Sequence, residues 1–394
     1  MKTVVKRLVL FFDGTDNTPD DLTNVWRAHE LLADADRDGI PQLKKYIAGV
    51  GTDTGFRLRG SIFGEGVISR MCQGYEWLVA NYESGCEIYV FGFSRGAFTA
   101  RSTVQMIATC GLLRPEALAG TSVRQMFARY EAISKGEEQP IWRLRFFKEE
   151  LPAGWAPNEG DKVLMDNAKT RVVKVRMAGL WDTVGAMGGD AIANEGAVTQ
   201  KSAAHNVRPT KAQEYGYHAV AIDEHRSMFD VTLWRTFVAE GKEQETLQRY
   251  AKYYEQRWFI GAHSDVGGGY KDDRLPDYSL SWMLSKASAL GLEFKSVVTP
   301  VENGWSAPVH DSFSKFAFGI LNIWSKILPG DQRLYREIGR VPKVVSAGDG
   351  TNGNLMCINE VVDPSVFVRW TKDSAYRPPS LVRYFKNNPD SLPK

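Results

Sequence analysis

The stretch VFGFSRGAFTA (90–100) holds a serine, Ser94, midway between Gly92 and Gly96. A serine on a strained strand-to-helix turn is a nucleophile elbow, and its flanking glycines are needed because a Cβ at either position would strike neighbouring backbone. The G-x-S-x-G pattern is short enough to arise by chance, so its surroundings decide. The apolar run EIYVF precedes it and a helical pattern follows, which favours an elbow with Ser94 as the nucleophile.

A serine nucleophile needs a general base, and the base needs an acid that orients it. Among six histidines we favour His263 as the base, because it follows the apolar run RWFIGA and precedes the glycine-rich SDVGGGY. For the acid we favour Asp182, which ends the apolar run VRMAGLW, over Asp190 in a glycine loop and Asp265 near the histidine. Asp265 is instead expected to cap a turn or brace the His263 loop. The order Ser…Asp…His is that of α/β-hydrolases.

The developing oxyanion of an acyl-transfer reaction needs backbone donors near the nucleophile. One donor is expected to be the amide of Arg95, directly after the serine, assisted by the dipole of the helix that begins there. The turn FFDGTDNT after the first apolar run offers the amides of Gly14 and Thr15, and we expect Gly14 to supply the second donor. Asp13, Thr15 and Asp265 are expected at the edge of the site.

Apolar runs alternate with helical patterns along the chain. Parallel strands buried on both faces read as continuous apolar runs, and strand–turn–helix repetition indicates a three-layer α/β fold with a mostly parallel sheet. Functional residues of such sheets lie at the carboxyl ends of the strands, where the polar clusters named above fall. The expected strands are 7–13, 86–92, 171–182 and 256–265, and the expected helices are 24–36, 97–113 and 277–293.

We expect a single α/β-hydrolase-like domain over residues 1–394, with two insertions. Residues 120–170, rich in Trp, Pro and charge, are expected to form a cap, and residues 300–355 a lid or membrane-contact insertion. Within the second, FSKFAFGILNIWSKIL (313–328) places aromatic and aliphatic side chains on one helical face, so it could act as a lid or lie at a bilayer interface. An ordinary core-packing helix is the alternative.

The composition is that of a globular protein, with 43% hydrophobic and 24% charged residues. A formal net charge of +2 with scattered basic residues gives no reason to expect a nucleic-acid partner. The four cysteines lie far apart, which argues against a zinc site and suits a reducing compartment. The sequence shows neither a signal peptide nor a transmembrane segment, so we expect synthesis in the cytoplasm and any export without a cleaved N-terminal signal.

Six motifs in this order are similar to the catalytic domain of the type VI secretion phospholipase effector family 1, a group of α/β-hydrolases. The match runs from about residue 6 to residue 292, with a weaker echo to about residue 381. The motifs are LVLFFDGTDNT, YIAGVGT, VFGFSRGAFTAR, GLWDTVGA, YHAVAIDEHRSMFDVTLW and WFIGAHSDVGGGY.

The resemblance implies phospholipase A1 or A2 activity on bacterial membranes through Ser94, Asp182 and His263, with no metal or organic cofactor. It also implies a phospholipid surface as substrate, an immunity protein and a secretion-spike protein as partners, and delivery into target cells. Three alternatives stay open. They are a serine esterase for soluble or non-lipid esters, a non-enzymatic binding protein that keeps the fold, and a metallohydrolase built on Asp13, Asp182, His263 and Asp265.

Overall fold

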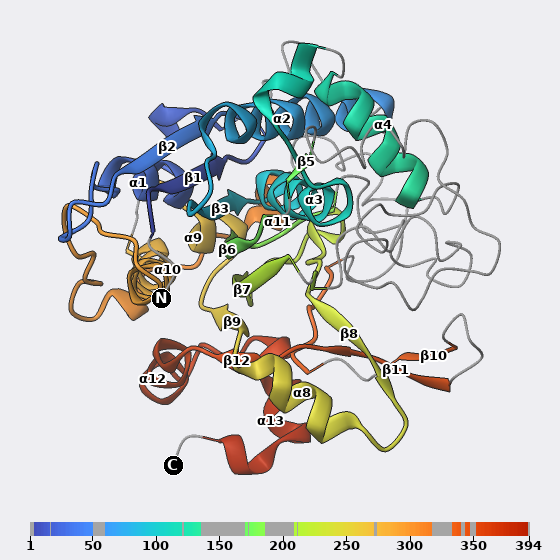
Figure 1. Cartoon of the computed structure of the whole chain (residues 1–394). Helices are drawn as coiled ribbons and strands as arrows, with labels where there is room; N and C mark the ends of the chain where they lie inside the picture. The colour runs from blue at the N-terminus through green and yellow to red at the C-terminus, as the bar shows by residue number, and fades with distance from the viewer. Residues whose placement is uncertain are drawn as a thin grey trace.

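The structure is a computed structural model of the chain (Figure 1). It describes residues 4–15, 17–49, 60–119, 122–134, 170–171, 173–185, 209–210, 212–271, 274–316, 333–339, 343–346 and 352–392. No helix within these ranges combines the length and the apolar character that crossing a bilayer requires.

A seven-stranded sheet forms the centre, in the order β12-β9-β7-β6-β3-β1-β2, and each neighbouring pair is parallel. From β1 the chain continues to β2 on one side and then returns to β3 on the other, so the topological switch point lies between β1 and β3. Ligands of such sheets bind outside the strand ends at that point. The strands are β1 (Arg7–Phe12), β2 (Gln42–Ile47), β3 (Glu87–Phe93), β6 (Val175–Trp181), β7 (Gln213–Ala221), β9 (Tyr254–Phe259) and β12 (Glu360–Val362).

Helices cover both faces of this sheet, which gives the three layers (Figure 1). On one face lie α2 (Gly60–Asn81), α3 (Arg95–Cys110) and α4 (Val123–Ser134). On the other face lie α1 (Asn24–Leu31) and α10 (Pro276–Ala289), with the short α9 (His263–Gly267) at the strand ends. The fold is therefore α/β, with a mostly parallel central sheet between two helical layers, as predicted.

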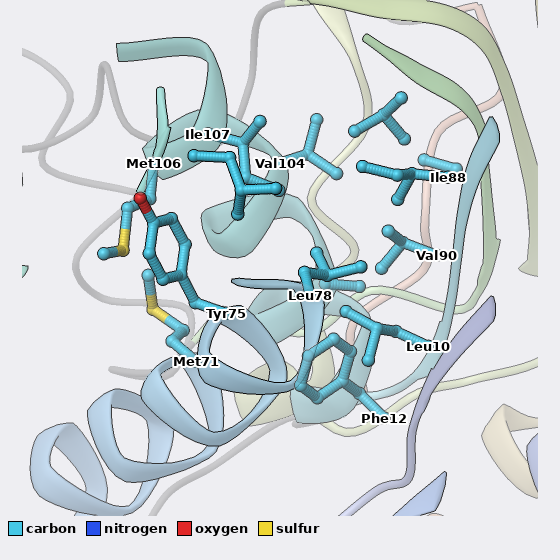
Figure 2. Close-up of a cluster of buried hydrophobic side chains, with 14 of the residues drawn as sticks. Leu10, Phe12, Met71, Tyr75, Leu78, Ile88, Val90, Val104, Met106 and Ile107 are labelled. Atoms are coloured by element: carbon cyan, nitrogen blue, oxygen red, sulfur yellow. The ribbon is translucent and has the colours of Figure 1, made fainter. Parts of the chain in front are cut away.

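The alternation of side chains along β1 explains why its whole run is apolar. Leu8, Leu10 and Phe12 pack against α2 and α3, in the cluster shown in Figure 2. Val9 and Phe11 point to the opposite face and pack against α1 and α10. Because both faces of the strand are buried, an apolar side chain is favoured at every position.

A smaller antiparallel sheet and the C-terminal helices lie beside the β9–β12 edge of the central sheet (Figure 1). Its order is β10-β11-β8. The strands are β8 (Arg235–Ala239), β10 (Lys343–Ser346) and β11 (Asn352–Cys357), and the helices beside them are α8 (Glu243–Ala251), α12 (Pro364–Lys372) and α13 (Pro379–Asn387). The short helix α11 (Ser312–Phe316) lies elsewhere, as do the paired strands β4 (Leu112–Leu113) and β5 (Thr170–Arg171).

All four expected strands and all three expected helices are present, with ends that differ by up to six residues. The largest difference is at the strand predicted over 256–265, because the strand ends at Phe259 and residues 263–265 belong to the short helix α9. The expected strands correspond to β1, β3, β6 and β9, and the expected helices to α1, α3 and α10. Most of the expected cap (120–170) and most of the amphipathic segment 313–328 lie outside the described residues. The expectations of a cap, a lid and a single domain therefore stay predictions.

Candidate active site

Ser94 occupies the turn between β3 and α3 with φ 57° and ψ −125°, a strained backbone conformation for a residue with a side chain. The two glycines make this turn possible. A Cβ on Gly92 would lie 2.5 Å from the carbonyl oxygen of Gly96, and a Cβ on Gly96 would lie 2.2 Å from that of Phe12. The turn is therefore a nucleophile elbow in its backbone geometry, and it presents Ser94 at the β1–β3 switch point.

Asp182 directly follows β6, the next strand along the sheet, and is fully buried. Its amide donates to the carbonyl of Ala219 on β7, and its φ of 40° turns the chain away from the sheet. The amide of Thr183 then donates to Nε2 of His218. Burial is the main cause that lowers the pKa of His218, to about 3, so this imidazole stays neutral and braces the turn.

His263 is the first residue of α9, beyond the carboxyl end of β9, and only 4% of it is exposed. Asp265 holds this turn together, because its carboxylate accepts hydrogen bonds from the amides of Ala262 (2.9 Å) and His310 (3.0 Å). Its other oxygen lies 2.6 Å from Nδ1 of His310. Asp265 thus links the start of α9 to His310, and its carboxylate oxygens contact these groups rather than the imidazole of His263.

The imidazole of His263 is oriented by Asp182. Nδ1 of His263 lies 2.5 Å from Oδ2 of Asp182, and both side chains are buried. Two aromatic rings contact the imidazole, that of Phe93 with its centroid 4.6 Å away and that of Phe229 at 5.0 Å. The arrangement fixes the histidine tautomer that carries its proton on Nδ1 and directs Nε2 away from the carboxylate.

The charge state of this pair suits a base held ready at neutral pH. Burial lowers the pKa of His263, and the hydrogen bond to Asp182 opposes that effect. For Asp182, burial would raise the pKa, but the guanidinium of Arg336 and the hydrogen bond to His263 outweigh it and hold the pKa well below its usual range. Asp182 is therefore ionised and His263 neutral at pH 7.

Ser94 adjoins this pair through Phe93, its neighbour on β3, whose ring packs on the imidazole. Within the described part of the chain, no hydrogen bond joins Ser94 to His263. Catalytic hydrogen bonds are often long in sites without substrate and tighten when substrate binds. The structure thus brings Asp182 and His263 into direct contact and Ser94 into the adjoining turn.

The loop after β1 lies against the elbow, since a Cβ on Gly14 would come within 3.4 Å of Cβ of Ser94. The Gly14 amide, however, donates to Oδ1 of Asp13 at 2.7 Å. This corrects the expectation that Gly14 supplies an oxyanion donor, because the Asp13 side chain folds back on the next amide of the turn. Asp13 is buried and is itself fixed by the hydroxyls of Thr23 (2.6 Å) and Tyr46 (2.7 Å).

Two buried charged residues of this site were not predicted from the sequence. Arg336 lies on the segment 333–339 and binds the Asp182 carboxylate with both terminal nitrogens. Glu224 accepts a hydrogen bond from the His263 amide at 3.3 Å and pairs with Arg226 at 2.8 Å. Glu224 falls in the motif YHAVAIDEHRSMFDVTLW, and this position could have marked it as a residue of the site. Nothing in the sequence around Arg336 points to the site.

The four residues of the metallohydrolase alternative do not converge. Asp13 binds Thr23 and Tyr46, and Asp265 binds His310, while Asp182 and His263 bind each other. Within the ranges that the structure describes, no three His, Cys, Asp or Glu side chains gather as metal ligands. A cavity of about 410 Å³ is lined by residues that include Asp223, His310 and Tyr376 but by none of the three triad candidates.

Residues 6–286 match the family model described as the catalytic domain of Tle1-like phospholipase effectors of the type VI secretion system. An uncharacterized protein of Saccharomyces cerevisiae is 26% identical over 249 residues, which cover 57% of this chain and 32% of the yeast protein.

Solved structures to which the chain is similar include the Tle1 effector bound to the VgrG spike, with 20% identity, a TM-score of 0.37, and coverage of 68% of this chain and 52% of that one. An uncharacterized protein from Pseudomonas aeruginosa shows 16% identity, a TM-score of 0.42, and coverage of 84% and 52%. An esterase of Thermogutta terrifontis shows 13% identity, a TM-score of 0.37, and coverage of 74% and 85%.

This chain spans about a third of the length of the yeast relative and about half of the Tle1 chain. The family model, by contrast, covers most of this chain and includes the elbow, the Asp182 turn and the His263 loop. The chain therefore belongs to the family of Tle1-like phospholipase effector catalytic domains of the type VI secretion system.

Proposed function

We propose that the protein is a serine hydrolase that cleaves the acyl esters of glycerophospholipids, with phospholipase A1 or A2 specificity. The observation that carries the proposal is the buried Asp182–His263 pair at 2.5 Å, placed beside a serine in elbow geometry. The family supplies the substrate class, since its members are described as phospholipase effectors.

In the proposed reaction, His263 Nε2 takes the proton from Ser94 Oγ as the oxygen attacks the acyl carbonyl. Asp182 stabilises the imidazolium that forms, without accepting its proton. The tetrahedral intermediate then collapses, the ester bond breaks, and the imidazolium protonates the departing lysophospholipid alcohol. A water molecule, deprotonated by His263, attacks the acyl-enzyme and releases the fatty acid.

We assign the oxyanion donors to the amides of Arg95 and Thr15. Arg95 is the first residue of α3, where amides have no acceptor within the helix and the helix dipole favours negative charge. Thr15 follows Gly14 in the loop that lies against the Ser94 turn. Asp13 fixes that loop through three hydrogen bonds.

From the family assignment we infer that the protein acts as an antibacterial effector delivered into target cells. A secretion-spike protein would carry it, as the VgrG spike binds the Tle1 effector in the solved complex. An immunity protein would protect the producing cell.

The experiment that tests the activity compares two substrates with one enzyme preparation. Vesicles of phosphatidylethanolamine and phosphatidylglycerol with a labelled acyl chain at either glycerol position report lipid cleavage and its position. A short-chain ester, assayed below and above its micellar concentration, reports esterase activity. The proposal expects fatty-acid release from vesicles and a rise in rate on micelle formation. Cleavage of the soluble ester alone, without that rise, would instead support an esterase for soluble substrates.

A further inference from the structure

Arg336 is a fully buried arginine whose guanidinium is committed to the candidate acid. Nη1 donates to Oδ1 of Asp182 at 2.6 Å and Nη2 donates to Oδ2 at 3.0 Å, across 154 residues of sequence. The same two nitrogens also donate to the carbonyl oxygens of Ala221 (2.8 Å) and Phe229 (2.5 Å). A bidentate guanidinium–carboxylate pair fixes the plane of the carboxylate as well as its position.

The carboxylate of Asp182 is held on every side by this arrangement. Oδ1 accepts from the amide of Ala221 at 2.9 Å and from Arg336. Oδ2 accepts from Arg336 and lies 2.5 Å from Nδ1 of His263. The two hydrogen bonds from Arg336 therefore fix the carboxylate in one orientation, in which Oδ2 faces the imidazole of His263.

The same guanidinium also supports the wall of the base. Phe229 ends a 3₁₀ turn (Ser227–Phe229), and its carbonyl accepts the hydrogen bond from Arg336 while its ring packs edge-on against His263. The guanidinium of Arg226 lies 3.6 Å from the centroid of that ring. Arg336 thus links the acid of the pair to the ring that restrains the base.

Resting on the proposed function, we propose that Arg336 is a positioning residue of the catalytic site, which orients Asp182 and holds it ionised so that the proton stays on His263 during acyl transfer. Burying an ionised carboxylate costs free energy, and a neutral histidine alone does not offset that cost. A positively charged partner beside the carboxylate does. Arg336 supplies that compensation without contact with the substrate.

The test compares Arg336→Met and Arg336→Lys with a matched control, Arg369→Met, in the full-length chain. Arg369 is also a buried arginine bonded to backbone carbonyls, those of Trp305 (2.9 Å) and Ala307 (2.7 Å), but it makes no contact with the triad candidates. Steady-state kinetics on a short-chain ester give kcat and KM across pH, normalised to folded protein by near-ultraviolet circular dichroism.

We expect Arg336→Met to lower kcat by about 100-fold, the scale expected when reacting groups are misplaced by about 1 Å, with KM close to wild type. Arg336→Lys keeps the positive charge but cannot make both hydrogen bonds to the carboxylate. Its kcat should therefore lie between those of wild type and Arg336→Met. The charged groups around His263 are Asp182, Glu224, Arg226 and Arg336. Removing one positive charge from this set should move the acid limb of kcat/KM to higher pH.

The proposal is overturned if Arg336→Met behaves like Arg369→Met, with reduced stability and unchanged kcat per folded molecule. If Arg336→Met does not fold, Arg336→Lys provides the test. A lysine variant with wild-type kcat would show that catalysis does not require the two hydrogen bonds from the guanidinium to Asp182. Failure of the proposed function looks different, since wild type itself would then release no product from ester substrates.

Discussion

The pairing of Asp182 with both His263 and Arg336 predicts that Asp182→Asn lowers both the stability of the protein and its catalytic rate. The wild-type carboxylate accepts four hydrogen bonds, from Ala221, His263 and the two nitrogens of Arg336. An asparagine of the same shape removes the negative charge, and its NH₂ group faces a donor wherever it points. Arg336, fully buried, then loses its counter-charge.

Breaking a buried ion pair by removing one partner costs about 3–5 kcal/mol of unfolding free energy, because the remaining charge is uncompensated. Loss of the carboxylate that sets the histidine tautomer costs about 10⁴-fold in kcat in the comparable serine triad. The variant should therefore be both less stable and nearly inactive. A second substitution distinguishes the two effects.

Adding Arg336→Met to Asp182→Asn removes the uncompensated charge. We expect the double variant to regain most of the lost unfolding free energy, since replacing a whole buried pair by neutral side chains is often neutral for stability. Its kcat should stay near that of Asp182→Asn. Urea unfolding followed by tryptophan fluorescence gives the first quantity, and hydrolysis of a short-chain ester gives the second.

Two results would contradict the expected roles of Asp182 and Arg336. A kcat of Asp182→Asn within about tenfold of wild type would mean that another carboxylate orients the base, because triad acids contribute far more. Equal stability of the single and the double variant would mean that Arg336 is not an uncompensated charge when Asp182 is gone. The single-site control Arg336→Met, measured alongside, completes the double-mutant cycle.

Three further predictions concern the elbow, the base and a neighbouring carboxylate. Gly96→Ala should cost about 1–3 kcal/mol or more of stability and most of the activity, because its Cβ would lie 2.2 Å from the Phe12 carbonyl oxygen, and thermal unfolding with ester hydrolysis checks both. The rate should fall at low pH as His263 is protonated, and since burial lowers its pKa, the acid limb of kcat/KM should lie below pH of about 6.5. Burial would raise the pKa of Glu224, but Arg226 outweighs this effect and lowers the pKa to about 2. The ionised Glu224 should therefore contribute about 3 kcal/mol to the unfolding free energy at pH 7. This contribution should be lost as the pH falls from about 4.5 to about 2. Urea unfolding of wild type and Glu224→Gln across that range should show the difference narrowing, and a constant difference would contradict it.

Strand ends were the part of the site that the sequence could predict. Ser94, Asp182 and His263 each follow a continuous apolar run, and strands that are parallel and adjacent bring such ends to one edge of the sheet. The edge strand β2 was not predicted because two lysines interrupt the apolar pattern of QLKKYI, and β7 was not predicted because Gly and Tyr interrupt its apolar run. Neither strand carries a triad candidate.

Contacts between distant segments could not be predicted in the same way. Arg336 and Asp182 are 154 residues apart in the sequence, and no spacing of residue types along the chain predicts that they form a contact. The sequence indicated that the Gly14 amide is a hydrogen-bond donor in the loop beside Ser94. Whether this amide donates to Asp13 or to an oxyanion depends on the geometry of the turn, in which the Asp13 carboxylate accepts its hydrogen bond. Both features come from tertiary packing.

Covalent labelling tests directly whether Ser94 is the nucleophile. Wild type, Ser94→Ala and Ser102→Ala, a buried serine of α3 outside the elbow, would be treated with a fluorophosphonate and digested for mass spectrometry. We predict one adduct on Ser94 in wild type and in Ser102→Ala, with complete loss of fatty-acid release from phospholipid vesicles on labelling. In Ser94→Ala we predict neither an adduct nor fatty-acid release. Fatty-acid release by folded Ser94→Ala at the wild-type rate, or an adduct on another residue that abolishes activity, would contradict this role of Ser94.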